Sequence, residues 1–476
     1  MTTSLVWFRD DLRVADHPAL AAGRSEGAVV ALYVLDEESE GIRPLGGAAR
    51  WWLHHGLEDL RAGLERLNVP LVLRRGAAPE VLREVLEASS ADAVYWNRRY
   101  GGPERSVDQR VKSEAAEAGL HAESFQASLL HEPWTVRNGQ GEHYKVFTPF
   151  WKAASARHVR PPVDAPARQG SAPANLPDSE DLADWDLLPT HPDWAGGLRE
   201  AWTPGEAAGH QALEDFLDGP VADYPQDRDR PSRPGTSRLS PYLRWGHVSP
   251  FQVWDAAVRA RTPRNHQAVQ TFTAELGWRE FCWSQLYHHP DLAEANLRPE
   301  FSDYPWQWPR ESGTPHDAGA FPDPVPDGGP SPTARVRAWR RGRTGVPLVD
   351  AGQRELWATG WMHNRVRMVT ASFLVKNLGI HWRVGEQWFW DTLVDADAAN
   401  NPANWQWVAG SGADAAPFFR IFNPLTQHDR FDPDDDYVRR WVPSFGQEGY
   451  PEPIVDVKQS RAAALEAYQR LRDANR

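Results

Sequence analysis

The sequence predicts two kinds of fold in one chain: an α/β amino-terminal domain with a doubly wound parallel sheet, and an all-α carboxyl-terminal domain. In the first part, short apolar runs rich in β-formers alternate with helical patterns, which is typical of a Rossmann-like sheet covered by helices. After about Gly205 the patterns are almost entirely helical. The 476 residues also exceed the size at which a single core stops growing. We therefore expect an α/β domain at 1–130, an interdomain connector at 131–205 and a helical domain at 206–476.

The expected elements of the first part follow one another in strand and helix order. The strands are predicted at Ser4–Phe8, Ala28–Leu35, Pro70–Leu73 and Ala93–Trp96, and the helices at Ala48–Leu67, Pro79–Ala88 and Val107–Ala118. A ligand is then expected at the carboxyl ends of the strands. From about 158 to 204 the chain is rich in Pro, Ala, Asp and Ser, which indicates a surface connector. A second irregular stretch, about 309–332, is rich in Pro, Gly and Asp.

Composition excludes several classes of protein. Cys282 is the only cysteine, so internal disulfides, zinc fingers and four-cysteine iron–sulfur clusters are excluded. No apolar run reaches the length of about eighteen residues that a membrane helix needs, and the amino terminus lacks the pattern of a signal peptide. We expect a cytoplasmic protein without a membrane partner. The net charge of −13 argues against indiscriminate coating of nucleic acid.

Arginine is nevertheless dense in two places, which are either solvated surface or a footprint for nucleic acid. The two sets are Arg228, Arg230, Arg233, Arg238 and Arg244, and Arg335, Arg337, Arg340, Arg341 and Arg343. Between and after them lie many of the 24 tryptophans. Any one of them is more often core packing, but so high a density indicates a further role, because tryptophan is rarely buried completely and its N–H requires a partner.

Two helical patterns place polar and aromatic side chains on one face. Glu275, Trp278 and Arg279 are spaced i, i+3, i+4, and Asn364, Arg365 and Met368 are spaced i, i+1, i+4. A carboxylate, an amide, an aromatic ring and a thioether facing one cavity would suit the edge of a base, although each pattern alone is more often ordinary surface.

Three further polar residues, Asp395, Asp397 and Asn401, follow a helix-like segment. Hard cations want more oxygen ligands than these supply, so an ion pair of Asp395 with Arg367 is favoured and no metal is predicted. Residues 236–240 precede a helix-like run, where hydroxyl and backbone N–H groups form either a site for pyrophosphate or a simple N-cap.

Seven segments resemble signatures of the photolyase/cryptochrome family, in the order that the family shows. They are Val6–Arg13, Gly235–Ser240, Trp278–Phe281, Trp361–Met368, Asp395–Trp407, Arg420–Pro424 and Tyr450–Val455. The resemblance covers nearly the whole chain. It is strongest to class I-type bacterial photolyases for cyclobutane pyrimidine dimers (CPDs) in DNA.

The resemblance implies an FAD in the helical domain and an amino-terminal antenna domain. The implied cofactor contacts are Tyr224, Thr236, Ser237, Arg238, Leu239, Ser240, Phe272, Arg279, Trp361, Asn364, Arg367, Asp395, Asp397 and Asn401. Asn401 occupies the position beside the flavin N5, where other branches carry an acidic residue or a cysteine. A second chromophore, either a deazaflavin, a methenyltetrahydrofolate or FMN, would lie near Arg9, Arg50 and residues 97–100.

The resemblance also implies how a lesion is handled. Blue light would excite reduced FAD, one electron would pass to a flipped-out dimer, the ring would open and the electron would return; base flipping is a known property of photolyases. The implied catalytic residues are Glu275, Trp278, Asn364, Met368 and Trp407, and the implied DNA contacts are Arg228, Glu275, Trp278, Arg365 and Trp407. Asn364 and Met368 favour CPDs over (6-4) photoproducts, since (6-4) enzymes usually carry histidines there.

A tryptophan chain toward the flavin is implied as well. Trp405 and Trp382 match its inner and middle members, and Trp306, Trp308 and Trp339 are candidates for the outer one, of which we select Trp339. We expect a monomer that acts on CPD-containing DNA without an obligate protein partner, associated with the bacterial nucleoid. The competing interpretations are a cryptochrome-type photoreceptor, a (6-4) enzyme and a flavin oxidoreductase for small molecules.

Overall fold

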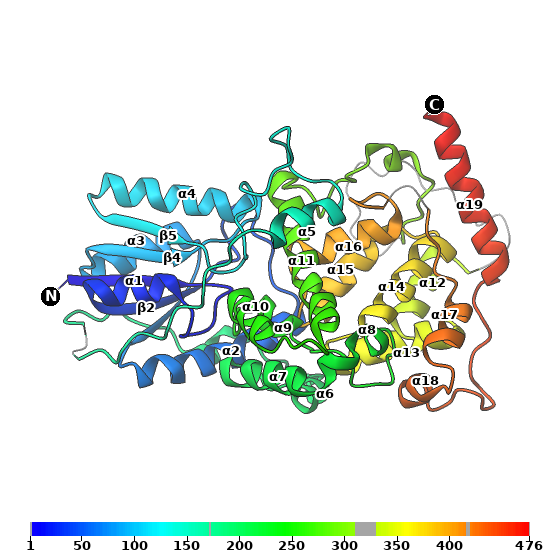
Figure 1. The fold of residues 1–476 in the computed structure, drawn as a ribbon, viewed down its shortest axis with the longest axis horizontal. Coiled ribbons are helices and arrows are strands. Elements are labelled where there is room, and N and C mark those ends of the chain that lie inside the picture. Colours follow the sequence, from blue (N-terminus) through cyan, green and yellow to red (C-terminus); the bar gives the residue numbers. More distant parts are fainter. Residues whose placement is uncertain (1, 171–172, 310–329, 416–418, 476) are drawn as a thin grey trace. The chain divides into compact units, whose positions relative to one another are not determined.

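The computed structural model describes residues 2–170, 173–309, 330–415 and 419–475. The chain divides into two compact units (Figure 1). Unit 1 comprises Met1–Ala222 and Thr236–Pro290, and unit 2 comprises Asp223–Gly235 and Asp291–Arg476. The domain boundaries predicted from composition stay predictions, and each unit is described by itself.

Unit 1 contains a five-stranded parallel sheet with the strand order β3-β2-β1-β4-β5. The strands are β1 (Thr2–Phe8), β2 (Gly27–Leu35), β3 (Leu71–Arg75), β4 (Ala93–Asn97) and β5 (His121–Phe125). The parallel sheet and its four predicted strands are confirmed. The edge strand β5 escaped prediction because its sequence, HAESF, is mostly polar and only one of its residues is buried.

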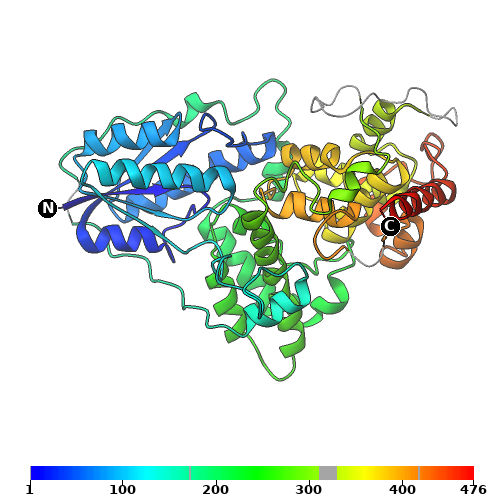
Figure 2. The same cartoon turned by 90° about the horizontal axis from the view of Figure 1, so that it is seen from above.

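Helices cover both faces of this sheet. On one face Leu5 and Trp7 join a buried cluster with α3 (Ala78–Ser89) and α4 (Gly102–Glu117). On the other face α1 (Pro18–Glu26) packs so closely that a Cβ on Gly23 would lie 3.0 Å from Val6. Figure 2 shows α1, in dark blue, on the opposite side of the sheet from α3 and α4. The alternation of side chains along each strand therefore gives two apolar faces, as a doubly wound sheet requires.

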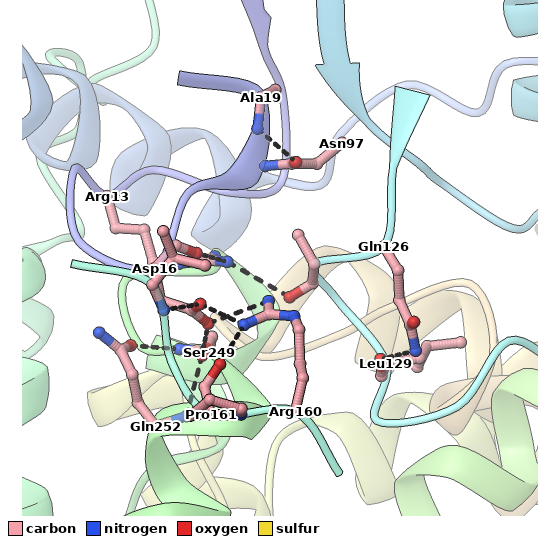
Figure 3. Close-up of polar contacts among 12 residues, drawn as sticks. Arg13, Asp16, Ala19, Asn97, Gln126, Leu129, Arg160, Pro161, Ser249 and Gln252 are labelled. Carbon is pink, nitrogen blue, oxygen red and sulfur yellow. Dashed lines mark hydrogen bonds and ion pairs between the residues drawn. The ribbon is translucent and has the colours of Figure 1, made fainter. Parts of the chain in front are cut away.

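Further helices belong to the same unit. They are α2 (Gly47–Arg66), α5 (Phe147–Ser155), α6 (Gly196–Ala201), α7 (Glu206–Asp218), α9 (Ser240–Arg244), α10 (Pro250–Arg259) and α11 (His266–His288). A buried polar network ties α10 to the loop after β1 (Figure 3). Asp16 accepts hydrogen bonds from Arg160 at 2.6 Å and from the hydroxyl of Ser249, the N-cap of α10. Arg13 donates to the carbonyl groups of Asp16 and Gly246.

Unit 2 is helical in its described residues. Its elements are α8 (Tyr224–Asp227), α12 (Pro332–Arg340), α13 (Pro347–Thr359), α14 (Asn364–Ser372), a π-helical turn (Phe373–Asn377), α15 (Trp382–Thr392), α16 (Asn400–Ala409), α17 (Pro424–Phe431), α18 (Asp436–Trp441) and α19 (Val457–Ala474). One large buried cluster lies among α12 to α16 and includes Trp339, Trp382 and Trp405. None of the described helices combines the length and the apolar character that crossing a bilayer demands.

Candidate functional site

A buried amide lies near the start of α16 in unit 2. Asn401 is 8% exposed, and its Nδ2 donates to the carboxylate Oε1 of Glu386 at 2.8 Å and to the Glu386 carbonyl at 3.0 Å. Both amide hydrogens are thereby directed at α15. The Oδ1 of Asn401 has no hydrogen-bond partner among the described residues. The helix pair thus orients the carbonyl oxygen of Asn401, which none of the described residues uses as an acceptor.

An ion pair lies next to this amide, since α14 and α16 pack on each other. Arg367 on α14 binds Asp395 through two parallel hydrogen bonds of 2.8 and 3.1 Å. The Asp395 side chain is only 2% exposed, whereas the Arg367 side chain is 24% exposed, so the pair holds a buried carboxylate. The predicted Arg367–Asp395 ion pair is therefore confirmed.

Asp397 has a role in the backbone of the same region. Its Oδ1 accepts from the N–H groups of Ala399 and Asn400, and its Oδ2 from the Asn400 side chain at 2.7 Å. The carboxylate therefore caps the amino-terminal end of α16, where a negative charge is favourable. This cap fixes the start of the helix that carries Asn401.

The first turn of α14 carries the residues that the sequence assigns to a lesion. Asn364 is exposed, and Met368 lies one turn further along the same face. Between them, Arg365 pairs with Asp229 at 2.8 Å and lies 4.5 Å from the ring centroid of Phe431. A phosphate would have to compete with Asp229 for this guanidinium.

His363 caps α14 with its ring. Its Nδ1 accepts from the N–H of Arg365 at 3.2 Å, and Nε2 has no partner. Burial lowers the pKa of His363 to about 4, so the imidazole is neutral at physiological pH. A neutral ring avoids adding a third cation beside Arg365 and Arg367.

Trp407 lies on α16 and is less buried than Trp405. Its ring is partly buried against Phe422, and the Arg420 guanidinium lies 5.0 Å from its centroid. Its Nε1 is buried and has no partner, as is also true of Trp405 two residues earlier. Trp407 and Arg420 thus place an aromatic face and a positive charge side by side.

The tryptophans proposed for electron transfer lie in the core of unit 2. Trp382 and Trp405 are 0% and 2% exposed, and the Trp405 ring packs directly on Gly385, one turn after Trp382. His381 adjoins Trp382 and stacks on Trp308 with ring centroids 4.2 Å apart. Trp339 instead lies 6.2 Å from Trp405 and is 0% exposed. Trp339 is therefore beside the inner member and away from solvent, which does not suit an outer member.

In unit 1, α11 carries three of the predicted site residues. Glu275, Trp278 and Arg279 are half-buried on this helix. The Trp278 ring lies flat on Phe147 with centroids 3.7 Å apart and an angle of 9° between the planes. Arg279 donates to the carbonyl of Ser128 at 2.7 Å. One face of Trp278 is therefore covered by the chain itself.

The segment at 236–240 leads into the short helix α9. Arg238 has a left-handed backbone with φ of 52°, and its guanidinium stacks on Trp202 at 4.2 Å. The N-cap residue of α9, Leu239, has an apolar side chain and makes no side-chain cap hydrogen bond. Leu239 is buried. Phe272 on α11 is also buried and packs against Phe216 on α7. Three further predicted contacts lie in unit 2, namely Tyr224, Arg228 and Trp361. The Arg228 guanidinium lies 5.3 Å from the centroid of the Tyr224 ring. The Arg367 guanidinium lies 5.8 Å from the centroid of the Trp361 ring.

The carboxyl edge of the sheet, predicted to hold an antenna, is strongly charged. Arg9 pairs with Asp108 at 2.5 Å, and Arg50 binds both oxygens of Glu37. Arg99 lies 3.8 Å from Asp10. Arg9 and Asp10 follow β1, and Arg99 and Asp108 follow β4, so they lie at the switch point of the doubly wound sheet, whereas Glu37 and Arg50 follow β2.

Comparison with known proteins identifies the family. Residues 272–448 match the model described as the FAD binding domain of DNA photolyase, and residues 4–167 match the model described as DNA photolyase. The deoxyribodipyrimidine photo-lyase of Agrobacterium fabrum is 44% identical over 98% of this chain and 97% of the relative. Cryptochrome-1 of Arabidopsis thaliana is 33% identical over 98% of this chain and 70% of the relative.

A solved structure agrees with these matches. The crystal structure of a bacterial class III photolyase from Agrobacterium tumefaciens superposes with a TM-score of 0.91 and 42% identity, covering 99% of this chain and 98% of that one. The chain belongs to the DNA photolyase family and contains the FAD-binding domain of that family.

Sequence reasoning missed several residues of the site. Glu386 orients Asn401, Asp229 holds Arg365, and Phe147 covers Trp278, but none of them was singled out. Arg420 lay within a recognised segment without an assigned role. Each missed contact joins side chains at least 13 residues apart, so no local spacing pattern could have revealed it.

Proposed function

We propose that this protein uses light to repair CPDs in DNA, with FAD as its cofactor. The observation that carries the proposal is the buried amide of Asn401, whose hydrogens are taken by Glu386 and whose oxygen is left free. The neutral carbonyl oxygen of Asn401 can accept a hydrogen bond from an N–H group. A carboxylate at position 401 would instead face the Glu386 carboxylate, which disfavours two like charges.

The donors and acceptors around Asn401 fit a flavin ring. A guanidinium, an ionised carboxylate and an amide with an unused oxygen suit a planar group that carries carbonyl and N–H functions. Arg367, Asp395 and Asn401 would hold the ring, with Trp361 and Asn364 nearby, and Asp397 would fix the helix that presents Asn401. The segment Thr236–Ser240, with Tyr224, Phe272 and Arg279, would hold the rest of the cofactor. When bound, FAD supplies the light absorption and the electron that repair requires.

The lesion would be handled by the residues that the family resemblance assigns to it. Asn364 and Met368 would contact the dimer, and Glu275 would stabilise its reduced form by hydrogen bonding. Trp278 has one face on Phe147, so its other face and the ring of Trp407 would provide stacking surfaces for the unstacked bases. Arg228 and Arg365 would bind phosphates next to the lesion, and we add Arg420 because it lies beside Trp407.

When the bound flavin is oxidised, Trp382 and Trp405 would carry the electron that reduces it. We now propose Trp308 as the outer member in place of Trp339, because Trp308 contacts His381 next to Trp382 and is only partly buried. Photoreduction, measured as bleaching of the oxidised flavin, should be slowed by Trp308→Phe more than by Trp339→Phe. Equal rates in parent and Trp382→Phe proteins would refute the whole chain.

The antenna and the class within the family stay predictions. The charged edge near Arg9, Arg50 and residues 97–100 would hold a deazaflavin, a methenyltetrahydrofolate or FMN. The motifs favour a class I-type enzyme, whereas a solved relative at 42% identity bears the class III designation. Action as a cytoplasmic, nucleoid-associated monomer without an obligate protein partner is likewise a prediction.

The deciding experiment illuminates the reduced, FAD-loaded protein with oligonucleotides that contain either a CPD or a (6-4) photoproduct. We expect loss of the CPD alone, and a lower repair yield per absorbed photon for Glu275→Ala. Loss of the (6-4) product would instead indicate a (6-4) enzyme. If neither lesion is lost while the flavin still responds to light, the cryptochrome alternative is favoured.

A further inference from the structure

The second arginine-rich stretch surrounds a cavity that the proposed reaction does not use. This cavity has a volume of about 510 Å³ and lies between α12, α13 and α15, entirely within unit 2. Cavities of a few hundred Å³ usually hold one small molecule. The volume of the cavity therefore suits one small molecule rather than a protein partner.

The charge of the cavity wall is of one sign. Arg337, Arg340, Arg341 and Arg354 line it, and none of the described lining residues is acidic. The Arg341 side chain has no ion-pair or hydrogen-bond partner among the described residues, and Arg354 uses only its Nε, which donates to the carbonyl of Gly342 at 3.1 Å. Guanidinium groups that converge in this way favour phosphate, which they can bind with two parallel hydrogen bonds.

Two tryptophans form an aromatic part of the wall. Trp357 and Trp388 are parallel to within 1°, with ring centroids 5.9 Å apart. Trp357 is 57% exposed, which is unusual for so large an apolar ring in the absence of a ligand or partner. Such a ring offers a stacking surface for a flat heteroaromatic group.

A buried amide supplies the third element. Gln353 is 1% exposed, and its Oε1 accepts from the Trp388 indole N–H at 3.0 Å. Its Nε2 has no partner. Because a buried donor without an acceptor is costly, this N–H₂ group is suited to an acceptor on the ligand. Nucleobases carry such acceptors on their edges.

We propose that this cavity is a binding site for a nucleoside phosphate. The base stacks against Trp357, an acceptor on its edge receives a hydrogen bond from Gln353, and the phosphates bind Arg341 and Arg354. The cavity accommodates one nucleotide, so the ligand is a mononucleotide rather than a strand of nucleic acid. The site is independent of the flavin and lesion residues.

The test is a calorimetric titration of the FAD-loaded protein with ATP. We expect a single class of site, with dissociation constants raised about tenfold by Arg341→Gln and by Trp357→Leu, as for the loss of a charge-assisted hydrogen bond or of one stacking contact. The matched controls are Arg83→Gln on α3 and Trp194→Leu, which alter an exposed arginine and an exposed tryptophan elsewhere. Both controls should bind ATP as the parent does.

Two further probes separate the parts of the site. Adenosine should bind more weakly than ATP and remain sensitive to Trp357→Leu, and inorganic triphosphate should remain sensitive to Arg341→Gln. Absence of ATP binding, or equal affinity in the parent and both site variants, would overturn the proposal. Displacement of ATP by single-stranded oligonucleotides with an affinity that rises with their length would replace it with a strand-binding site.

Discussion

Asn97 in unit 1 and Asn401 in unit 2 are both buried amides, yet the protein uses them differently. Asn97 is saturated. Its Nδ2 donates to Asp11 at 2.7 Å, and its Oδ1 accepts from the N–H of Ala19, the contact drawn in Figure 3. Asn401 donates its amide hydrogens to Glu386, and its Oδ1 has no hydrogen-bond partner among the described residues. A saturated amide stabilises a fold, whereas an amide with one unused atom can also bind a ligand.

Two buried histidines show the same difference. In unit 1, His247 uses both ring nitrogens, with Nδ1 2.9 Å from the carbonyl of Leu12 and Nε2 accepting from the Trp52 indole at 3.1 Å. In unit 2, His363 uses Nδ1 for the cap of α14 and leaves Nε2 without a partner. In unit 2, the amide of Asn401 and the ring of His363 thus each keep one unused polar atom at α16 and α14, which we assign to the cofactor.

The largest expected effect is a loss of stability at Asn97. Asn97→Ala would remove one donor from the Asp11 carboxylate, which keeps the Arg9 N–H and His17, and would leave the Ala19 N–H without its acceptor. We expect a cost of about 3 kcal/mol in the free energy of unfolding. Urea denaturation measures this change. Asn175→Ala, at an exposed position, should change the same quantity by less than about 0.5 kcal/mol. Equal costs at the two positions would remove the distinction between a saturated buried amide and a surface one.

The second effect is on repair. Asn401→Ala should lower the CPD repair rate of the FAD-loaded protein about a hundredfold, the usual cost of losing one preorganised polar group at a reacting centre. Single-turnover repair under constant illumination measures this rate, and Asn175→Ala should leave it unchanged. A repair rate that survives Asn401→Ala would show that the free oxygen serves no function.

The third effect is on the pH dependence of stability. Burial lowers the pKa of His247 from 6.5 to about 4, so the folded state holds this ring neutral where the unfolded state protonates it. The contribution to stability is complete above pH 6.5 and is lost as the pH falls toward 4. Between pH 7.5 and 5 the free energy of unfolding should fall by about 2 kcal/mol on this account.

Substitution of the ring isolates this contribution. His247→Phe should be less stable than the parent at pH 7.5 but should lack about 2 kcal/mol of the decrease toward pH 5. Urea denaturation at both pH values measures the two slopes. If the parent and the variant lose the same free energy of unfolding toward pH 5, protonation of His247 in the folded protein costs no free energy. The two hydrogen bonds of its ring would then not hold the imidazole in the neutral form.

The smallest effect concerns the support of Asn401. Glu386→Gln keeps an acceptor for the Asn401 amide but replaces a charged hydrogen bond by a neutral one, a difference of about 1 kcal/mol. We expect the repair rate to fall about fivefold, between the rates of the parent and of Asn401→Ala. A rate as low as that of Asn401→Ala would mean that the Glu386 charge itself, and not the orientation of the amide, matters.

Much of the fold could be predicted from the sequence because its signals are local. Apolar runs such as Ser4–Phe8 and Ala28–Leu35 end at polar turns and alternate with amphipathic helices, so the parallel sheet follows from chain order. The edge strand β5 was missed because only one of its five residues is buried. An edge strand is held mainly by backbone hydrogen bonds, which leave little trace in side-chain pattern.

The candidate site was predictable to a lesser degree. Arg367 and Asp395 lie 28 residues apart and pair as the motifs implied. The prediction of Trp339 as outer electron carrier rests on its sequence position, which does not reveal that it packs on Trp405 and is fully buried. Likewise, nothing in the sequence distinguishes Arg341, which faces a cavity, from Arg335, which is buried in α12.

The sequence by itself therefore determined the family, the parallel sheet except β5 and the helical character of the carboxyl-terminal part, and it indicated the polar residues that we propose for a flavin. Only the tertiary structure decided which atoms of those residues are already occupied by the protein. The reason is physical: helix and strand periodicity acts over a few neighbouring residues, whereas the saturation of a buried amide depends on partners from other elements, as Glu386 on α15 decides for Asn401 on α16.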